Sequence, residues 1–230
     1  MRKEKKGISL NGFSACYDLL TPAECSRLRR RQIELAGVRE GEAVLDVGCG
    51  PGALTVLAGL AAGRKGSAAG IDLAPRMIER ARRKAKRIGL EIDFRVASVD
   101  DIPWPDGSFD LVISSMMFHH LPVRIKEAAL LEIHRVLKPE GRLFLYDFAV
   151  PSPLTFPLML LLLVWIAPTR YQLLGRLPAL IRRCGFVYSE WIHRGIFFNG
   201  TLNYKQRWPA RPTEEPDAGT PEIGGEQPCG

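Results

Sequence analysis

The sequence lacks the cysteine patterns that define small disulfide-bonded or metal-bound domains. Its five cysteines are widely spaced and include no CxxC pair, so neither a disulfide framework nor a zinc site is expected. No metal is expected elsewhere in the chain, and no internal repeat is present. The fold must therefore depend on a hydrophobic core, for which 230 residues with 46% hydrophobic content are sufficient.

Long apolar runs are also scarce. The longest, Leu154–Ala167, has fourteen residues, whereas a membrane-crossing helix needs about 20. Residues 1–16 carry basic side chains without a continuous apolar core, which makes a poor signal peptide. We therefore expect a cytoplasmic protein, with peripheral association at a membrane surface left open.

The positive charge is unevenly distributed. The net charge is +7, yet residues 209–230 contain five acids, one arginine, five prolines and four glycines, a composition typical of a disordered tail. The more basic remainder would suit nucleic acid, anionic lipid or an acidic substrate, or would serve solubility alone. No interleaving of basic and aromatic residues supports the first option, so no nucleic-acid partner is expected. The oligomeric state is left open.

Strand-like and helix-like segments alternate through much of the chain. EAVLDVG predicts a buried strand, and PGALTVLAGLAAG predicts a helix with Pro51 at its first position. This alternation is typical of βαβ units and a mainly parallel α/β sheet. Two later strands, VYSEWIHRGIFF and TLNYKQRW, are expected to form a hairpin around Asn199-Gly200. We predict one domain over residues 1–208, followed by the tail.

The motif VLDVGCGPG, residues 44–52, carries the first chemical signal. Its glycines permit a tight turn and close approach of backbone to a ligand, and the following helix N-terminus favours electron-rich groups. Asp72 ends the next strand, where a carboxylate can accept both ribose hydroxyl hydrogens. Alternatively, Asp46 satisfies loop amides and Asp72 caps a helix. Jointly these residues favour an adenosine-containing ligand, either NAD or S-adenosylmethionine.

Four segments resemble, in the correct order, the successive motifs of class I S-adenosylmethionine-dependent methyltransferases. They are VLDVGCGPGALT, GIDLAPRMIERAR, DIPWPDGSFDLVISSMMFHHL and EIHRVLKPEGRLFLYDF. The similarity is closest to the small-molecule branch that includes ubiquinone and menaquinone C-methyltransferases. It implies a Rossmann-like sheet of seven strands, mainly parallel, with an antiparallel last hairpin and helices on both faces. It also implies S-adenosylmethionine as cofactor and a small acceptor.

The resemblance implies a role for particular residues as well. Asp72 would hold the ribose, Leu73 would lie against the adenine, and Tyr17 would fold over the cofactor from a helical lid, residues 1–36. The glycine turn and the end of the fourth strand would surround the methionine moiety. The implied cofactor contacts are Tyr17, Asp46, Gly48, Cys49, Gly50, Asp72, Leu73, Ser98, Val99 and either Ser114 or Ser115.

One position departs from the family pattern. Ser98 replaces an acid that usually accepts a hydrogen bond from the adenine amino group, and Val99 and Asp100 follow it. A bond to a neutral hydroxyl has roughly half the strength of a charge-assisted one. We therefore expect weaker cofactor binding, unless a shifted loop lets Asp100 substitute.

His119 and His120 are the candidates for a catalytic base. They follow the fourth strand, where catalytic loops collect in open α/β sheets. Methyl transfer from a sulfonium needs alignment above all, and a base only when the acceptor arrives protonated. Because histidine pairs are frequent here in the family, a structural role explains both residues too.

Residues 151–183 interrupt the alternation with an apolar insert followed by a helix. The run Leu154–Ala167 shows no polar face, unlike a surface amphipathic helix. It could pack on the sheet, roof the active site, or dip into a lipid surface with help from nearby arginines. The last two interpretations favour a lipophilic acceptor.

Other functions stay open on the sequence alone. A cofactor-binding protein without methyl transfer fits the serine at position 98 and the absence of an obvious catalytic base. A nicotinamide-dependent oxidoreductase would need a second nucleotide-binding half, and none is evident. Methylation of nucleobases is disfavoured, because SSMMFHHL stands where amino-methylating enzymes often carry an Asn-Pro-Pro-Tyr type loop.

Overall fold

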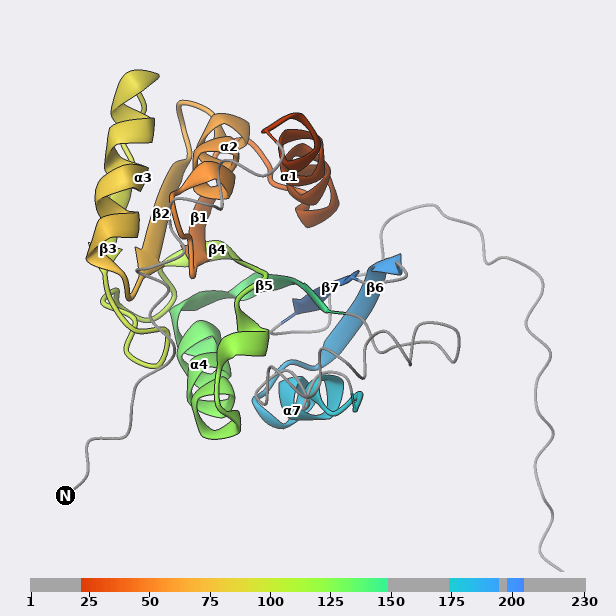
Figure 1. The fold of residues 1–230 in the computed structure, drawn as a ribbon. Helices are drawn as coiled ribbons and strands as arrows, with labels where there is room; N and C mark the ends of the chain where they lie inside the picture. Colours follow the sequence, from red (N-terminus) through yellow and green to blue (C-terminus); the bar gives the residue numbers. More distant parts are fainter. Residues whose placement is uncertain (1–21, 149–173, 195–197, 205–230) are drawn as a thin grey trace, which may run out of the picture.

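A twisted seven-stranded sheet forms the centre of the protein (Figure 1). The computed structural model describes residues 22–148, 174–194 and 198–204. The strands are β1 (Ala43–Val47), β2 (Ser67–Asp72), β3 (Asp93–Val96), β4 (Phe109–Ser115), β5 (Leu137–Phe148), β6 (Tyr188–Arg194) and β7 (Phe198–Tyr204). The helices are α1 (Pro22–Ala36), α2 (Ala53–Ala62), α3 (Pro75–Arg87), α4 (Val123–Val136), α7 (Leu177–Arg183) and a 3₁₀ turn, η1 (Phe118–His120).

The strand order is β3-β2-β1-β4-β5-β7-β6. The first five strands are parallel, β7 runs antiparallel to β5, and β6 antiparallel to β7. This arrangement confirms the predicted fold class. The chain proceeds outward from β1 to β3 and then returns to β4 on the other side of β1. Ligands of open α/β sheets bind at such a switch point, beyond the carboxyl ends of the strands.

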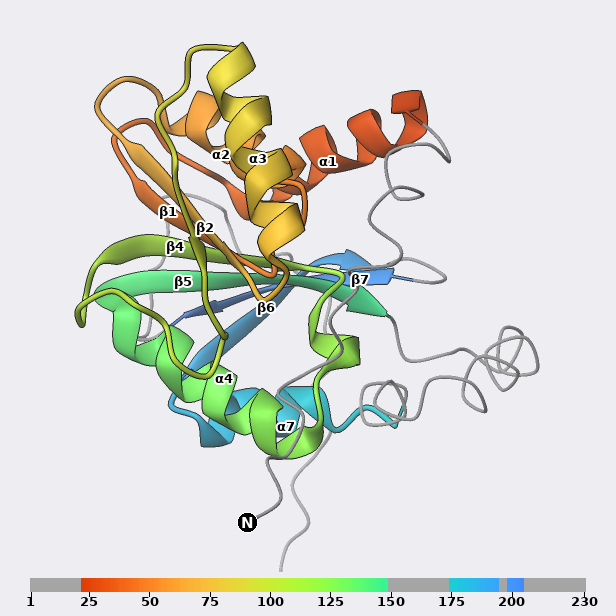
Figure 2. The ribbon, with the colours of Figure 1, turned by 60° about the vertical axis from the view of Figure 1, so that its left-hand side comes forward.

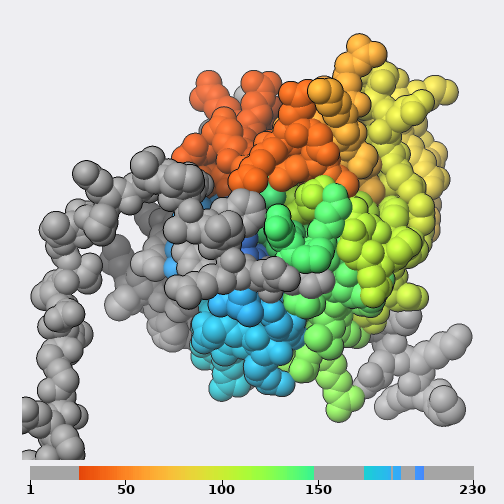
Figure 3. Space-filling model, turned by 180° about the vertical axis from the view of Figure 1, so that it is seen from behind, coloured from red at the N-terminus to blue at the C-terminus, as the bar shows by residue number. Residues whose placement is uncertain are grey.

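Helices cover both faces of the sheet. The helices α1, α2 and α3 lie on one face, and α4 and α7 lie on the other (Figures 1 and 2). Seen from behind, the end of β5 lies between the α1–α2 layer and α7 (Figure 3). The middle strands bury alternate residues toward each layer: Ile113 and Phe144 face the first, Val112 and Leu143 the second. Burial on both sides explains why these strands are almost continuously apolar.

Two local predictions are wrong. The helix α2 begins at Ala53 after Gly52, whose φ is 74°, so Pro51 lies in the turn rather than at the first helical position. Asn199-Gly200 does not form the hairpin turn. Both residues lie within β7, where Gly200 pairs with Tyr146 of β5 and sits beside an irregularity in β6. Glycine inside a strand commonly marks such a bulge.

Several predicted features fall outside the described residues. They are Tyr17 with the first part of the lid, the apolar run Leu154–Ala167 and the tail 209–230. Within the described ranges, no helix is both long enough and apolar enough to span a membrane. The same ranges contain no group of three or more histidine, cysteine or acidic side chains arranged to hold a metal ion.

Candidate functional site

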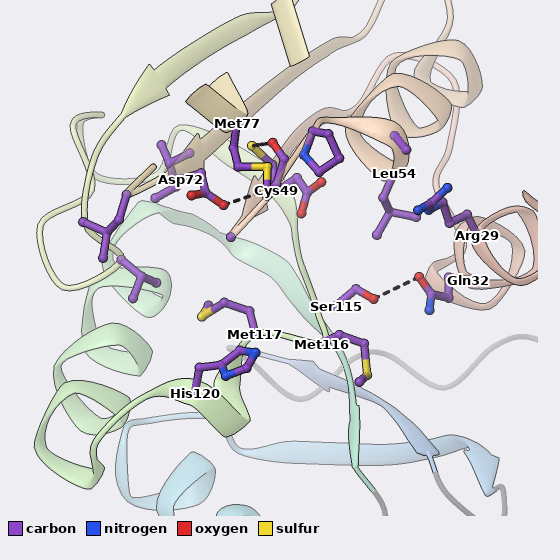
Figure 4. Close-up of a pocket in the computed structure, with 18 of the residues that line it drawn as sticks. Arg29, Gln32, Cys49, Leu54, Asp72, Met77, Ser115, Met116, Met117 and His120 are labelled. Atoms are coloured by element: carbon purple, nitrogen blue, oxygen red, sulfur yellow. Dashed lines mark hydrogen bonds between the residues drawn. The ribbon is translucent and has the colours of Figure 1, made fainter. Parts of the chain in front are cut away.

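A cavity of about 340 Å³ opens at the carboxyl ends of β1, β2 and β4 (Figure 4). This volume is at the lower end of the range for small-molecule sites, about 300–1,000 Å³. The walls come from the glycine turn after β1, the end of β2, the β4–η1 connection and one side of α1. The lining residues include Leu28, Arg29, Gln32, Asp46, Gly48, Cys49, Gly50, Leu54, Asp72, Leu73, Met77, Val99, Ser115, Met116, Met117 and His120.

The glycine turn brings bare backbone to the cavity. Gly48 and Gly50 have φ values of 74° and 52°, a region that side chains disfavour. A Cβ at Gly48 would lie 2.3 Å from Cγ of Met117, so only glycine allows the β4–η1 connection to approach this closely. A Cβ at Gly50 would meet no atom within 4 Å. The turn therefore leaves room beside its amides that a ligand can fill.

Asp72 satisfies loop amides and also faces the cavity. Its Oδ2 accepts a hydrogen bond from the Gly50 amide at 3.0 Å, and its Oδ1 accepts one from Ala74 at 2.8 Å. Burial raises the pKa of this carboxyl, while the two amides oppose the rise. A carboxylate has about four lone-pair sites, so each oxygen can still accept a hydroxyl hydrogen. The capping and ribose-binding interpretations are thus compatible.

Asp46 lies deeper at the same turn. It is buried, and Oγ1 of Thr55 donates to its Oδ2 at 2.6 Å. Burial raises the pKa of Asp46 to about 7. Burial also raises the pKa of the neighbouring Cys49 thiol, so Cys49 contributes an uncharged wall rather than a thiolate nucleophile.

The histidine pair divides into a buried residue and a cavity-lining residue. His119 is buried and is held by Asp147 of β5 through its Nδ1 at 2.8 Å and its backbone amide at 3.1 Å. The His120 ring lies 3.8 Å from the His119 ring, centroid to centroid, and lines the cavity. Burial, followed by the neighbouring His119, lowers the pKa of His120 to about 4. His120 is therefore neutral near pH 7, so its ring can accept a proton, but the lowered pKa makes it a weaker base than an ordinary histidine.

Three of the candidate residues do not line the cavity. The Ser98 hydroxyl donates to the Asp100 carboxylate, and His119 is occupied with Asp147. Ser114 is fully buried, and its Oγ has no hydrogen-bond partner among the described residues. Ser115 does line the cavity and donates to Oε1 of Gln32 at 3.1 Å.

Some lining residues were missed by sequence reasoning. Arg29 and Gln32 belong to α1 in the predicted lid, residues 1–36, where Tyr17 alone was expected to contact the cofactor. Arg29 and Gln32 are three residues apart and so lie on one helix face, but only packing shows that this face meets the cavity. Met116 and Met117 follow β4. With φ at 55°, Met116 is the one non-glycine residue in the described chain with positive φ, and such outliers cluster at functional sites.

The strand order, the glycine turn after β1 and the acid after β2 together define the class I S-adenosylmethionine-dependent methyltransferases. Comparisons with known proteins agree. The sequence profile of a family described as "Methyltransferase domain" matches residues 44–141. A demethylmenaquinone methyltransferase of Tropheryma whipplei (strain Twist) is 34% identical over 206 residues, covering 79% of this chain and 83% of that protein.

Two further comparisons cover the core of the fold. A demethylmenaquinone methyltransferase of Thermus thermophilus is 39% identical over 134 residues, covering 58% of this chain and 59% of that protein. A solved SAM-dependent methyltransferase from Aquifex aeolicus superposes with a TM-score of 0.62 at 22% identity, covering 81% of this chain and all of that chain.

The chain belongs to the methyltransferase family that contains these demethylmenaquinone methyltransferases. Its cofactor is S-adenosylmethionine, and neither the oxidoreductase nor the inactive binding protein is favoured. The cavity fits this cofactor, because it offers unfilled space at Gly50 and free acceptor capacity on Asp72. The cofactor supplies an activated methyl group. The protein's own residues have to bind it, align the acceptor and exclude water.

Proposed function

We propose that this methyltransferase acts on a hydrophobic, quinone-type acceptor that enters the cavity beside Met116 and Met117. The main supporting observation is the composition of this wall, which adds two flexible thioethers and Leu121 to the apolar Leu28 and Leu54 across the cavity. Methionine adapts to flat and irregular apolar ligands. The relatives named demethylmenaquinone methyltransferases act, by name, on a molecule of this class.

The proposed cofactor orientation follows from the polar groups. Asp72 takes the ribose hydroxyls, and Leu73 and Val99 flank the adenine. Asp46 and the amides of Gly48 to Gly50 surround the methionine moiety. Ser115, rather than Ser114, lies at the methionine end, because only Ser115 lines the cavity.

We assign the proton-accepting role to His120. Carbon methylation of a reduced quinone ring is promoted when a ring hydroxyl loses its proton, because the resulting oxyanion donates electron density to the ring. His120 is uncharged and faces the cavity. His119 and Asp147 hold the turn η1 on which His120 sits, so we give His119 a positioning role.

The direct test uses labelled S-adenosylmethionine and a reduced demethylmenaquinone with a shortened side chain. We expect label in the quinone product, and roughly a 100-fold or larger drop in kcat for His120→Asn, the usual contribution of a general base. Binding of S-adenosylhomocysteine should be unchanged in that variant. Label transfer at the wild-type rate would remove His120 from the mechanism. No transfer to any quinol by the wild type, despite cofactor binding, would overturn the acceptor class.

We further propose that the protein works in the cytoplasm at a membrane surface, with Leu154–Ala167 as the contact. The exposed arginines Arg182 and Arg183 of α7 would suit anionic headgroups. Deleting Leu158–Ile166 should reduce flotation with anionic vesicles. Undiminished flotation would reject this contact.

A further inference from the structure

One buried side chain next to η1 carries a charge that the proposed mechanism does not use. Lys126 lies in the first turn of α4 and has no exposed surface, at 0%. Lysine is almost never fully buried unless its ammonium group is paired, because desolvating the charge is costly. A methionine would fill similar space without that cost, so packing alone does not explain a lysine at this position.

The ammonium group of Lys126 contacts the segment that carries His120. Its Nζ donates a hydrogen bond to the backbone oxygen of Leu121, the residue that directly follows η1. His120 and Leu121 both line the cavity, and the His120 ring lies below Met117 in Figure 4. Lys126 therefore holds the cavity wall at the point where η1 leads into α4.

Asp147 of β5 holds the same segment with the opposite charge. Its Oδ2 accepts a hydrogen bond from the His119 amide at 3.1 Å, and its Oδ1 lies 2.8 Å from Nδ1 of His119. Asp147 is itself buried, and charges inside a protein are screened less than charges at its surface. A buried cation on α4 and a buried anion on β5 thus hold residues 119–121 between them.

We propose that Lys126 is a positioning residue for methyl transfer, whose charged ammonium group fixes residues 119–121 so that His120 meets the acceptor in one orientation. This inference rests on the proposed function, in which His120 accepts a proton from the acceptor. The bond to Leu121 is charge-assisted and therefore stronger than a bond between neutral groups. The charge also acts on His120 directly: burial and His119 lower the pKa of His120 most, Asp147 opposes them, and Lys126 adds to the lowering.

The charge of Lys126 can be removed by pH as well as by mutation. Burial lowers the pKa of Lys126 to about 8, and Asp147 opposes this change, so Lys126 is charged at pH 7 and neutral well above pH 8. The titratable groups on the elements packed around it are Asp147 of β5, His119 and His120 of η1, Cys184 after α7, and Arg183 of α7, which pairs with Glu127 at 3.1 Å.

The test compares Lys126→Met with Arg124→Met in the full chain. Both variants remove one cation from the first turn of α4, but Arg124 is exposed. With labelled S-adenosylmethionine and the shortened reduced demethylmenaquinone, Lys126→Met should lower kcat roughly 10- to 100-fold, because misplacing reacting groups by about 1 Å can cost 100-fold. The KM for the quinol and the affinity for S-adenosylhomocysteine should change little. Arg124→Met should match the wild type in all three.

The pH dependence of this difference separates charge from packing. Ionisation of the acceptor affects both proteins equally, so it cancels in the ratio of the wild-type kcat to that of Lys126→Met. The ratio should be large at pH 7 and should fall as pH rises through about 8, because the wild type then loses the same charge. A ratio that does not change with pH would overturn the proposal, since a lysine that only fills space gives that result.

A measurement without acceptor keeps this test separate from the proposed function. In an NMR titration, the pKa of His120 should rise in Lys126→Met and stay unchanged in Arg124→Met. An unchanged pKa of His120, a wild-type kcat, or equal losses of kcat and of S-adenosylhomocysteine affinity in Lys126→Met would each overturn the proposal. A wild type that methylates no quinol would instead reject the proposed function. If Lys126→Met does not fold, Lys126→Gln, which keeps a donor without the charge, carries the same measurements.

Discussion

Two cavities of the same volume, about 340 Å³ each, lie at opposite ends of the sheet. One is the cofactor pocket at the carboxyl ends of the strands. The other, which we call the charged cavity, lies where β1, β4 and β5 begin. It is lined by Arg39, Glu42, Asp110, Lys138, Pro139, Glu140 and Arg142.

The charged cavity largely satisfies its own polar groups. Arg142 binds both carboxylate oxygens of Glu42, at 2.8 and 3.0 Å, and Lys138 binds both oxygens of Asp110, at 2.8 and 2.7 Å. In the cofactor pocket, Arg29, the amide nitrogen of Gln32 and part of the acceptor capacity of Asp72 have no protein partner among the described residues. Volume alone therefore does not distinguish a binding site. The unmatched donors and acceptors do distinguish it. Mutations in the charged cavity should therefore lower stability, whereas mutations in the cofactor pocket should lower ligand affinity.

The largest expected effect is on stability at the charged cavity. Arg142→Met should lower the free energy of unfolding by about 3–5 kcal/mol, because it leaves the Glu42 charge buried without its partner. The Arg142 side chain is 5% exposed and that of Glu42 12%. Denaturant unfolding measures the loss, and calorimetry should show unchanged affinity for S-adenosylhomocysteine.

The double variant Arg142→Met/Glu42→Met is the control for that experiment. It should recover much of the lost stability, because no uncompensated charge remains. If the single variant unfolds like wild type but binds the cofactor poorly, the two ends are not functionally separate.

The opposite pattern is expected for Asp72→Ala in the cofactor pocket. S-adenosylhomocysteine should bind roughly 100-fold more weakly or worse, because two charge-assisted hydrogen bonds of about 1.5–3 kcal/mol each are lost. The amides of Gly50 and Ala74 lose their acceptor, which should cost about 1 kcal/mol of stability, as at a helix cap. This variant should also bind 5′-methylthioadenosine more weakly, because that compound keeps the ribose and lacks only the amino-acid group. Retained affinity for both ligands would contradict the ribose assignment.

A pH titration of unfolding tests the buried acid of the pocket. The folded pKa of Asp46 is about 7, against an ordinary value of 3.8, so the folded state holds a proton that the unfolded state has released. Stability should therefore fall as pH rises from about 4 to about 7. This pH dependence is opposite in sign to that of a salt-bridged carboxylate. Asp46 therefore makes the folded protein less stable at neutral pH than at acidic pH.

Asp46→Asn provides the comparison, because it removes the titration and keeps an acceptor for Thr55. The stability of this variant relative to wild type should increase across that window by at least about 1.4 kcal/mol, the equivalent of one pKa unit. The lowered pKa of His120 acts in the other direction, but it is common to both proteins and cancels. A difference that stays constant with pH would show that Asp46 does not titrate in this range.

The sequence predicted the fold and the cofactor pocket only in part. The alternation of strand-like and helix-like segments predicted the mainly parallel sheet, and the strand ends placed Asp46 and Asp72 at one edge. Alternation along a strand puts only one of Ser114 and Ser115 on the pocket face, yet which face meets the pocket depends on the packing of α1. For the same reason, nothing in the sequence distinguishes Arg29 from the neighbouring arginines of α1. Local turn chemistry also failed at Asn199-Gly200, where pairing with β5 outweighed hairpin propensity.

The smallest expected effect is in the charged cavity itself. Lys138→Met removes an ion pair whose side chains are 44% and 28% exposed, and pairs this open to solvent contribute about 0–1 kcal/mol. Lys138→Met should therefore lose less stability than Arg142→Met, and added salt should make this loss smaller still. Unfolding of both variants at low and high salt measures the contrast. If Lys138→Met loses as much stability as Arg142→Met, the charged side chains of this cavity act as one network. The burial of an individual ion pair would then not determine how much that pair contributes to stability.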